Sequence, residues 1–332
     1  MWILGFQGAR TVDVMALAFR HDLAREAVKH AIEHYFDFVS RGLDRTAFIT
    51  HRFRSSAGRG RAGGQELACQ ATGMDDFYGD LAHDYEWLFP DETVGRLGRF
   101  GATSPGSQAL LEAVVKTLGP GSPVLDCACG IGADAMALAR SGLVITASDG
   151  SQAMVAETRR RSEQYGIAMT VSQSKWQELP NRVPGPFELV LCLGNSIVHT
   201  ETRTNMVTAL EGMKKVLSPA GTLVVDSRNW ELLYESRPRI VPAQQVIERK
   251  GLRCSSLYIW TIPDDFESPC TAEIVLLFED AEGRTSYHRH VIDFVPFRHD
   301  DLTDAIHAAG FTIRDDSYQA ASNFYAIVAA VT

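Results

Sequence analysis

Residues 124–134 read VLDCACGIGAD, and this stretch decides the fold. A short apolar run ends in Asp126, and two glycines, Gly130 and Gly132, follow before an alanine-rich segment begins. The pattern predicts a buried strand, a tight turn and the start of a helix. Glycines at such a turn let the backbone approach a ligand closely, with the N-terminus of the next helix beneath it. The stretch therefore predicts a nucleotide-like ligand.

From residue 104 onward, helical and strand patterns alternate along the chain. Such alternation is typical of βαβ units and a mostly parallel sheet. We therefore expect a Rossmann-like α/β fold, with a mostly parallel seven-stranded sheet and helices on both faces. The expected strands cover 123–128, 143–148, 168–172, 187–193 and 221–227, and two more strands flank the C-terminal end of the chain.

Residues 240–296 interrupt this alternation with extended segments separated by the turn residues PDD and AEG. Such a pattern predicts an antiparallel β insertion in the C-terminal half. The expected organisation is a cofactor-binding domain over 104–332 preceded by a lid segment over 74–103. Residues 1–73 are expected to be a poorly defined extension, either accessory or spurious.

Charge and composition narrow the range of possible binding partners. The chain has 332 residues and a formal net charge of -9, which disfavours nucleic acid as a partner. No apolar run approaches the roughly 20 residues that span a bilayer, and no signal-peptide pattern opens the chain, so a cytoplasmic protein without a membrane partner is expected. The expected partner is a small molecule, and a homo-oligomer is left open.

The cysteines do not have the spacing of a zinc site, so no metal is expected. Cys127 and Cys129 are separated by a single residue, and Cys192 lies far along the chain. We expect these three to be small apolar side chains near strand ends, because free cysteine is often buried.

Two acids narrow the choice of ligand. Asp149 closes the second expected strand, where a carboxylate would accept hydrogen bonds from ribose hydroxyls. Asp126 would repel a pyrophosphate but attract the ammonium of a methionyl group, which favours S-adenosylmethionine. A solvated acid at the end of a strand is the alternative for Asp126. A dinucleotide stays open, because GIGADA at 130–135 also fits the G-x-G-x-x-A pattern.

Several motifs resemble those of class I methyltransferases. VLDCACGIGAD and the acid in ITASDGS are similar to motifs of the whole superfamily, whereas FELVLCLGNSIVH and VLSPAGTLVVDSRNW resemble the glycine N-methyltransferases and their bacterial glycine/sarcosine relatives. The resemblance covers roughly residues 75–332. It implies S-adenosylmethionine as cofactor, with the methionyl end at Asp126, Gly130 and Gly132, the ribose at Asp149, the adenine at Lys175 and Trp176, and a further contact at Leu193. Lys175 departs from the family pattern, in which we expect Asn.

The resemblance also implies two acceptor residues, Asn195 and Arg228, with Arg228 pairing with a substrate carboxylate. An arginine just past the end of a parallel strand projects into the crevice where ligands of α/β sheets bind, and its planar fork matches a carboxylate. The alternatives are an ion pair of Arg228 with Asp226 or Glu231, and a turn-forming role for Asn195. For His199 we expect a role in helix capping or packing rather than in catalysis.

Aromatic side chains mark the lid segment. Tyr78, Tyr85 and Trp87 lie among acids in DDFYGDLAHDYEWLFPDE. Related enzymes use such a segment to cover the cofactor, which would place Tyr78 at the reacting centre and Tyr85 at the cofactor. Packing of these rings on the sheet is the alternative. Arg99 is expected, from its position, to reach the carboxylate of the cofactor.

These observations support one leading hypothesis, methyl transfer from S-adenosylmethionine to the amine of a small amino acid, glycine or sarcosine first, by direct SN2 displacement. The substrate would carry an amine and a carboxylate. A methyltransferase acting on nitrogen, oxygen or carbon of a specialised metabolite stays open, because the fold does not fix the acceptor. An NAD-dependent oxidoreductase or a non-catalytic cofactor-binding protein is the second alternative.

Overall fold

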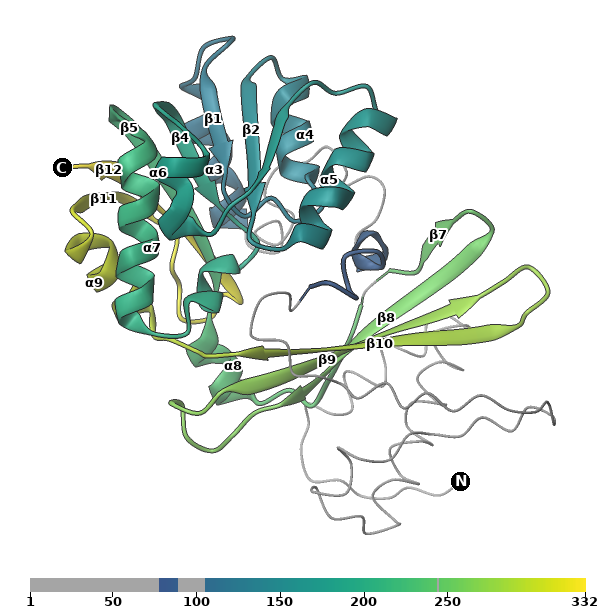
Figure 1. The fold of residues 1–332 in the computed structure, drawn as a ribbon. Helices are drawn as coiled ribbons and strands as arrows, with labels where there is room; N and C mark the ends of the chain where they lie inside the picture. The colour runs from purple at the N-terminus through teal and green to yellow at the C-terminus, as the bar shows by residue number, and fades with distance from the viewer. Residues whose placement is uncertain (1–77, 89–104, 244) are drawn as a thin grey trace, which may run out of the picture. The chain divides into compact units, whose positions relative to one another are not determined.

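The computed structural model describes residues 78–88, 105–243 and 245–332, and these contain two β-sheets (Figure 1). The first is seven-stranded, as expected, and its strand order is β11-β12-β5-β4-β1-β2-β3. Its strands are β1 (Pro123–Asp126), β2 (Val144–Asp149), β3 (Thr170–Gln173), β4 (Phe187–Cys192), β5 (Leu217–Arg228), β11 (Phe311–Asp316) and β12 (Phe324–Val331).

β1 lies between β2 and β4, and β1 to β5 all run parallel. The strand order reverses beside β1, which is where the loops at the carboxyl ends diverge and leave room for a ligand. β12 pairs antiparallel with both β5 and β11 at the other edge. The predicted fold class, a mostly parallel Rossmann-like sheet, is confirmed.

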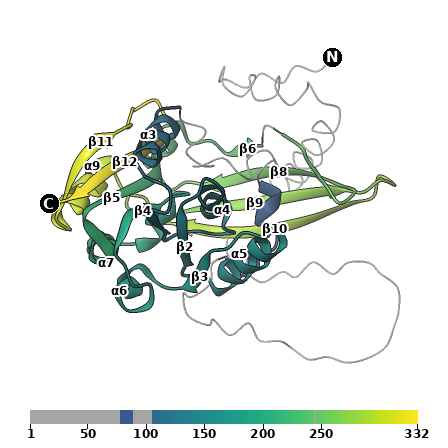
Figure 2. The same ribbon diagram turned by 90° about the horizontal axis from the view of Figure 1, so that it is seen from above.

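Helices cover both faces of this sheet, because its strands are apolar on both sides (Figure 2). Leu125 and Val190 point to the face covered by α6, α7 and α9, whereas Val124 and Leu189 point to the face covered by α3 and α4. The helices are α3 (Pro105–Lys116), α4 (Ala133–Arg140), α5 (Gln152–Gln164), α6 (Leu179–Arg182), α7 (Arg203–Val216), α8 (Trp230–Ser236) and α9 (His299–Ala308), with short 3-10 turns η2 (Tyr85–Leu88), η5 (Trp176–Glu178) and η6 (Ser196–Thr200).

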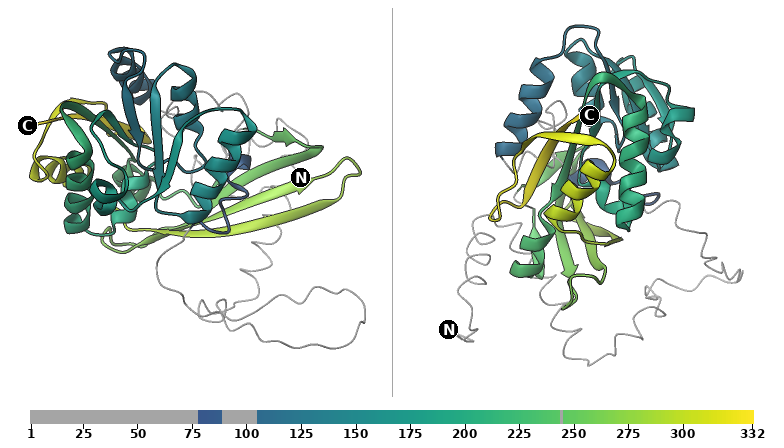
Figure 3. Two further views of the ribbon diagram at one scale, coloured as in Figure 1. Left: turned by 45° about the horizontal axis from the view of Figure 1, so that its top comes forward. Right: turned by 90° about the vertical axis from the view of Figure 1, so that its left-hand side faces the viewer.

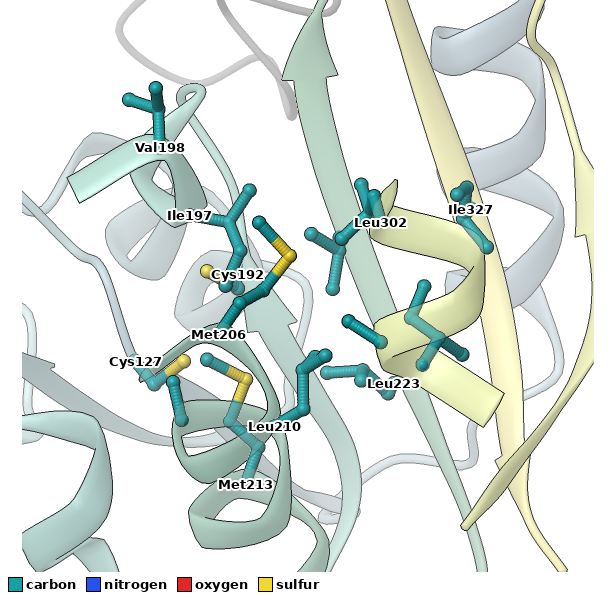
Figure 4. Close-up of a cluster of buried hydrophobic side chains, with 14 of the residues drawn as sticks. Cys127, Cys192, Ile197, Val198, Met206, Leu210, Met213, Leu223, Leu302 and Ile327 are labelled. Atoms are coloured by element: carbon teal, nitrogen blue, oxygen red, sulfur yellow. The ribbon is translucent and has the colours of Figure 1, made fainter. Parts of the chain in front are cut away.

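The larger core lies between the parallel sheet and the helices α7 and α9 (Figure 4). Met206 and Leu210 of α7 gather there with Leu302 of α9, and all three are at most 3% exposed. Cys127 and Cys192 belong to the same cluster and are buried at the ends of β1 and β4. The expectation that these cysteines are packed apolar side chains is confirmed.

The insertion at 240–296 forms a second, antiparallel sheet, as predicted, and Figure 3 shows its long strands in light green. β8 and β9 pair along nearly their whole length, and β9 pairs in the same way with β10. The strands are β6 (Ile240–Pro242), β7 (Ile247–Arg249), β8 (Leu252–Thr261), β9 (Cys270–Glu279) and β10 (Thr285–Phe294). None of the helices in the described part of the chain combines the length and apolar character needed to cross a bilayer.

One glycine fixes the contact between α7 and η5. A Cβ added at Gly212 would overlap the carbonyl oxygen of Trp176 and lie 3.2 Å from the Cα of Gln177. Replacing an exposed helical glycine with alanine ordinarily stabilises a protein by about 1 kcal/mol. For Gly212→Ala we expect the opposite, a loss of roughly 1–3 kcal/mol in the free energy of unfolding, because the helix and turn must separate.

Urea unfolding of the full chain measures this loss. Glu211→Ala is the matched control, because Glu211 is exposed on the same helix and its replacement is expected to change the stability by less than about 0.5 kcal/mol. A Gly212→Ala variant as stable as the parent protein would show that the helix and turn are not in tight contact.

Candidate functional site

The turn after β1 is built from backbone conformations that favour glycine. Gly130 and Gly132 have φ angles of 52° and 77°. A Cβ added at Gly132 would lie 2.7 Å from Cγ2 of Thr158 on α5. The hydroxyl of Thr158 donates a hydrogen bond to the carbonyl oxygen of Gly130 at 2.6 Å. The sequence VLDCACGIGAD therefore forms the predicted strand, turn and helix, with α5 packed directly beneath the turn.

Two acids stand at the ends of neighbouring strands in this site. Asp126 at the end of β1 is 2% exposed, and its carboxylate accepts a hydrogen bond from the backbone N–H of Ala128 at 3.3 Å. Asp149 at the end of β2 accepts hydrogen bonds from the N–H groups of Gly130 and Ser151, both at 2.9 Å. The alternative of a solvated acid for Asp126 is wrong, because the strand end and the glycine turn enclose it.

This arrangement fits S-adenosylmethionine. The ammonium and sulfonium of its methionyl end need a nearby carboxylate, which Asp126 provides. The ribose needs an acceptor at the end of β2, and each oxygen of Asp149 has a second lone pair beyond its backbone bond. The glycine turn lets the ligand approach the backbone without meeting a Cβ.

Lys175 and Trp176 come to the same end of the sheet. The indole N–H of Trp176 donates to the carbonyl oxygen of Cys127 at 2.9 Å, so η5 is tied to the residue after β1. Lys175 is the N-terminal flanking residue of η5. Leu193, directly after β4, is 4% exposed and packs in the core beside Val224. Roles for these residues in adenine or cofactor binding stay predictions.

The described part of the lid segment, residues 78–88, contacts both sheets. Ala82 packs against Ile131 of the glycine turn, and Leu81 packs against Ile274 and Ile292 of the antiparallel sheet. The ring of Tyr85 lies 3.9 Å from the place where a Cβ on Gly130 would stand. Tyr85 therefore lies beside the glycine turn, and its role toward the cofactor stays a prediction. Arg99 and the extension 1–73 lie outside the described residues.

Polar contacts also hold this segment, although no pattern in the sequence indicated them. Asp84 is 6% exposed, and its carboxylate meets Nδ1 of His288 at 2.7 Å and Nε2 of His290 at 2.9 Å. Glu86 pairs with the buried Arg161 of α5 at 3.0 Å. These partners lie far away in the chain, so only the tertiary structure joins them.

Tyr78 reaches the end of β4. Its hydroxyl is hydrogen-bonded to Nε2 of His199 in η6 at 2.8 Å. Burial lowers the pKa of His199 to about 4, and burial together with Asp149 and Tyr258 raises the pKa of Tyr78 above its usual value. Both groups are therefore neutral at pH 7, and neither is a ready general base.

His199 packs but does not cap the next helix. Its ring lies 5.6 Å from that of Phe294, centroid to centroid. The N-terminus of α7 is capped by Thr202, whose hydroxyl accepts a hydrogen bond from the N–H of Asn205 at 3.1 Å. The packing expectation for His199 is confirmed and the capping expectation is wrong, because η6 separates the histidine from α7.

Asn195 forms the turn after β4. Its φ of 62° is left-handed, and its side-chain oxygen accepts hydrogen bonds from the backbone N–H of Arg228 at 2.9 Å and from the hydroxyl of Ser227 at 3.4 Å. The turn-forming role of Asn195 is confirmed. The same bonds join the end of β4 to the end of β5, so Asn195 and Arg228 are brought together as the sequence predicted.

The guanidinium of Arg228 contacts two aromatic rings. Its central carbon is 5.2 Å from the ring centroid of Trp260 and 4.6 Å from that of Phe324. Burial lowers its pKa, and the neighbouring Tyr258 raises it. Tyr258 and Trp260 are functional candidates that the sequence reasoning missed. Their signal was the spacing of two aromatics on one face of the expected strand SSLYIWTI.

The expected alternative for Arg228, an ion pair with Asp226 or Glu231, is wrong. Asp226 accepts a hydrogen bond from the N–H of Asn195 at 2.7 Å. Glu231 instead lies 3.5 Å from Arg298 and accepts a hydrogen bond from the backbone N–H of His299. Within the described ranges, no carboxylate pairs with Arg228.

The tight glycine turn makes a sharp prediction. Gly132→Ala combines a left-handed φ with an overlap against Thr158, so we expect it to weaken binding of S-adenosylhomocysteine by about tenfold or more. Gly142→Ala is the matched control, since Gly142 has a φ of 91° with nothing within 4 Å of the added Cβ. Calorimetric titration of both variants measures the difference. Equal affinities would mean that the turn does not contact the ligand.

Residues 124–221 match a protein family described as a methyltransferase domain. A glycine/sarcosine N-methyltransferase from Parasynechococcus marenigrum is 34% identical over 112 residues, which cover 34% of this chain and 40% of that protein. The glycine N-methyltransferase of Rattus norvegicus is 28% identical over 184 residues, which cover 52% of this chain and 60% of that protein. This chain therefore spans less than two thirds of the length of either relative.

Solved structures share the fold. A S-adenosylmethionine-dependent methyltransferase from Clostridium acetobutylicum superposes with a TM-score of 0.56 at 15% identity, covering 76% of this chain and 98% of that one. The sugar N-methyltransferase KedS8 from Streptoalloteichus superposes with a TM-score of 0.55 at 20% identity, covering 84% and 99%. Residues 124–221 thus match a methyltransferase domain, and the chain is similar in sequence to the glycine and glycine/sarcosine N-methyltransferases and in fold to S-adenosylmethionine-dependent methyltransferases.

Proposed function

We propose that this protein transfers a methyl group from S-adenosylmethionine to the amine of a small amino acid, glycine or sarcosine first. The observation that carries the proposal is the guanidinium of Arg228, which contacts two rings and has no carboxylate partner among the described residues. The relatives named glycine and glycine/sarcosine N-methyltransferases support the same substrate class.

Arg228 is only partly exposed, so its charge is partly desolvated, and the cost of that desolvation favours an anionic ligand. Cation–π contact with an aromatic ring contributes only about 0.5–2 kcal/mol, whereas desolvating an unpaired charge costs several kcal/mol. Trp260 and Phe324 contact the guanidinium as π systems, and such contacts do not use its N–H donors, which lie in its plane. A carboxylate can accept two of those donors side by side. The substrate carboxylate would therefore complete the site.

The chain's own residues would position the two reactants and keep water out. Bound S-adenosylmethionine supplies an activated methyl group on a sulfonium. The turn carrying Asn195 connects the cofactor end of the sheet to Arg228, so the acceptor amine would be held close to the methyl group. Tyr78 and Tyr85 would cover the site from the lid segment, and a dry site favours a reaction in which charge disperses.

A larger amine is the second candidate acceptor. Tyr258, Trp260 and Phe294, all from the antiparallel insertion, give the acceptor side an aromatic wall, and such a wall suits stacking with a sugar or another ring. The fold neighbour KedS8 is named a sugar N-methyltransferase. A transfer assay with labelled cofactor over glycine, sarcosine, dimethylglycine and amino sugars separates the two candidates. The matched methyltransferase domain removes the reason for a nicotinamide-dependent alternative.

Arg228→Ala tests the carboxylate role. We expect unchanged affinity for S-adenosylhomocysteine and a loss of roughly 2–4 kcal/mol in kcat/KM for glycine and sarcosine, because the clamp is lost and the cofactor side is intact. Arg298→Ala is the matched control, since Arg298 also lies over a ring, that of Phe266 at 4.4 Å, away from the site. An equal loss with acceptors that lack a carboxylate would remove the proposed role.

The pH dependence of kcat/KM tests whether the acceptor is an amine that must lose its proton before it reacts. Because His199 is neutral with a pKa of about 4, no imidazolium or strong base acts there at neutral pH, and the amine must arrive deprotonated. We expect kcat/KM for glycine to rise from pH 7 to pH 9.5 and to approach a plateau near the pKa of the amine. His199→Asn is expected to preserve the slope of this profile. A rate independent of pH across the range would contradict an amine acceptor of this class.

A further inference from the structure

Asp226 is a buried acid on β5 that holds the turn after β4. It is 2% exposed, and its Oδ1 accepts a hydrogen bond from the N–H of Asn195 at 2.7 Å. The N–H of Gly194 also bonds to this carboxyl group. Gly194 and Asn195 both have left-handed backbones, with φ angles of 81° and 62°. A left-handed asparagine costs conformational free energy, so the two bonds to Asp226 stabilise a strained turn.

Through that turn, Asp226 also acts on Arg228. The side-chain oxygen of Asn195 accepts the backbone N–H of Arg228 at 2.9 Å, so a shift of the turn would move the arginine. Asp226 faces the α3 side of the sheet, where it lines a small cavity with Leu111 and Gln108. Asp226 therefore acts on Arg228 only through Asn195.

The second oxygen of Asp226 is unusual. Among the described residues, neither Oδ2 of Asp226 nor Oε1 of Gln108 has a hydrogen-bond partner, although both atoms are buried. The cavity that the two residues share has a volume of about 10 Å³, at the lower limit for a single water molecule. Each of these buried acceptors is stabilised by a donor, and a cavity at this limit leaves little room for a water molecule to supply one.

The orientation of Gln108 is fixed by its other end. Its Nε2 donates to the carboxylate of Glu112 at 2.8 Å, and rotating the amide would place Oε1 against that carboxylate instead. Gln108 therefore cannot supply the missing hydrogen to Asp226. A protonated carboxyl group on Asp226 can.

The charges around Asp226 favour the protonated form. Burial, with a smaller contribution from Asp134 on α4, raises its pKa to about 7, against the hydrogen bonds from Asn195 and Gly194, which lower it. The neighbour on β12 is Ala326, and the charged groups of α3 on this side are Glu112 and its exposed partner Lys116 at 3.8 Å.

We propose that Asp226 is a positioning residue that is a neutral carboxylic acid up to neutral pH, accepting the N–H groups of the turn on Oδ1 and donating a hydrogen bond from Oδ2 to Oε1 of Gln108. This chain of bonds ties the turn and β5 to α3. The hydrogen on Oδ2 of Asp226 is inferred without reference to the activity. Only the effect of Asp226 on the methyl acceptor rests on the proposed function.

The variant Asp226→Asn tests whether Oδ2 of Asp226 carries a hydrogen. The amide keeps Oδ1 as acceptor, donates from Nδ2 to Gln108 and cannot ionise. Because the pKa of Asp226 is raised from 3.8 when unfolded to about 7 when folded, the native protein holds a proton that the unfolded chain has lost. The stability from this proton is present at low pH and is lost as the pH rises to about 7. We therefore expect the Tm of Asp226→Asn to exceed that of the parent by a difference that widens from pH 5 to 7 and is constant from pH 7.5 to 9.

Glu163→Gln, a change to an exposed acid on α5, is the control, and its Tm difference is expected to stay flat over the same range. A flat difference for Asp226→Asn, or an Asp226→Asn variant less stable than the parent throughout, would overturn the neutral acid. If Asp226→Asn does not fold, the proposal of a neutral Asp226 is likewise wrong, because the amide of Asn has the same acceptor and donor as a protonated carboxyl group.

Gln108→Leu tests the partner of that hydrogen. Without the acceptor the protonated form loses its bond, so the pH at which the Tm becomes constant is expected to fall by about one unit. An unchanged profile would show that Asp226 does not donate to Gln108.

Kinetics test the positioning. We expect Asp226→Leu, which leaves the N–H groups of the turn unbonded, to raise the acceptor KM by about tenfold or more, with Asp226→Asn restoring it. Equal kinetics for the two variants would refute positioning through the turn. If neither the parent nor a variant methylates any amine, the proposed function fails, while the Tm profiles still decide the state of Asp226.

Discussion

Two carboxyl groups hold the turns on which this site depends. The chain leaves β1 and β4 through left-handed residues, a conformation that is unfavourable unless the backbone N–H groups find partners. Asp149 accepts the N–H of Gly130 at 2.9 Å, and Asp226 accepts that of Asn195 at 2.7 Å. In each case the acid lies at or near the end of a neighbouring strand, so the parallel sheet itself fixes both turns.

The acceptor side is assembled from segments that are distant in the chain. Arg228 ends a strand of the parallel sheet, Trp260 comes from the antiparallel insertion and Tyr78 from the lid segment. Each contributes a ring or a charge to a region that excludes water. Such a region keeps His199 and Tyr78 neutral, whereas it leaves the guanidinium charged and in need of an anion.

The local patterns carried most of the fold. The period of the apolar residues predicted the parallel strands, both groups of helices and the antiparallel insertion, because a strand buried on both faces and a helix buried on one leave distinct repeats. They also placed Asp126, Gly130 and Asp149 at one end of the sheet, since consecutive parallel strands all end there. Proximity in sequence and alignment of strand ends were sufficient for these residues.

The tertiary structure decided what those residues touch. The sequence by itself determined the sheet, the glycine turn and the presence of Arg228 at a strand end. It did not determine that Asp226 would bond to the backbone of Asn195 and not to Arg228, or that a ring from the insertion and a ring from β12 would contact the guanidinium. Those outcomes depend on contacts across more than thirty residues of chain, and on which buried groups find partners once water is excluded.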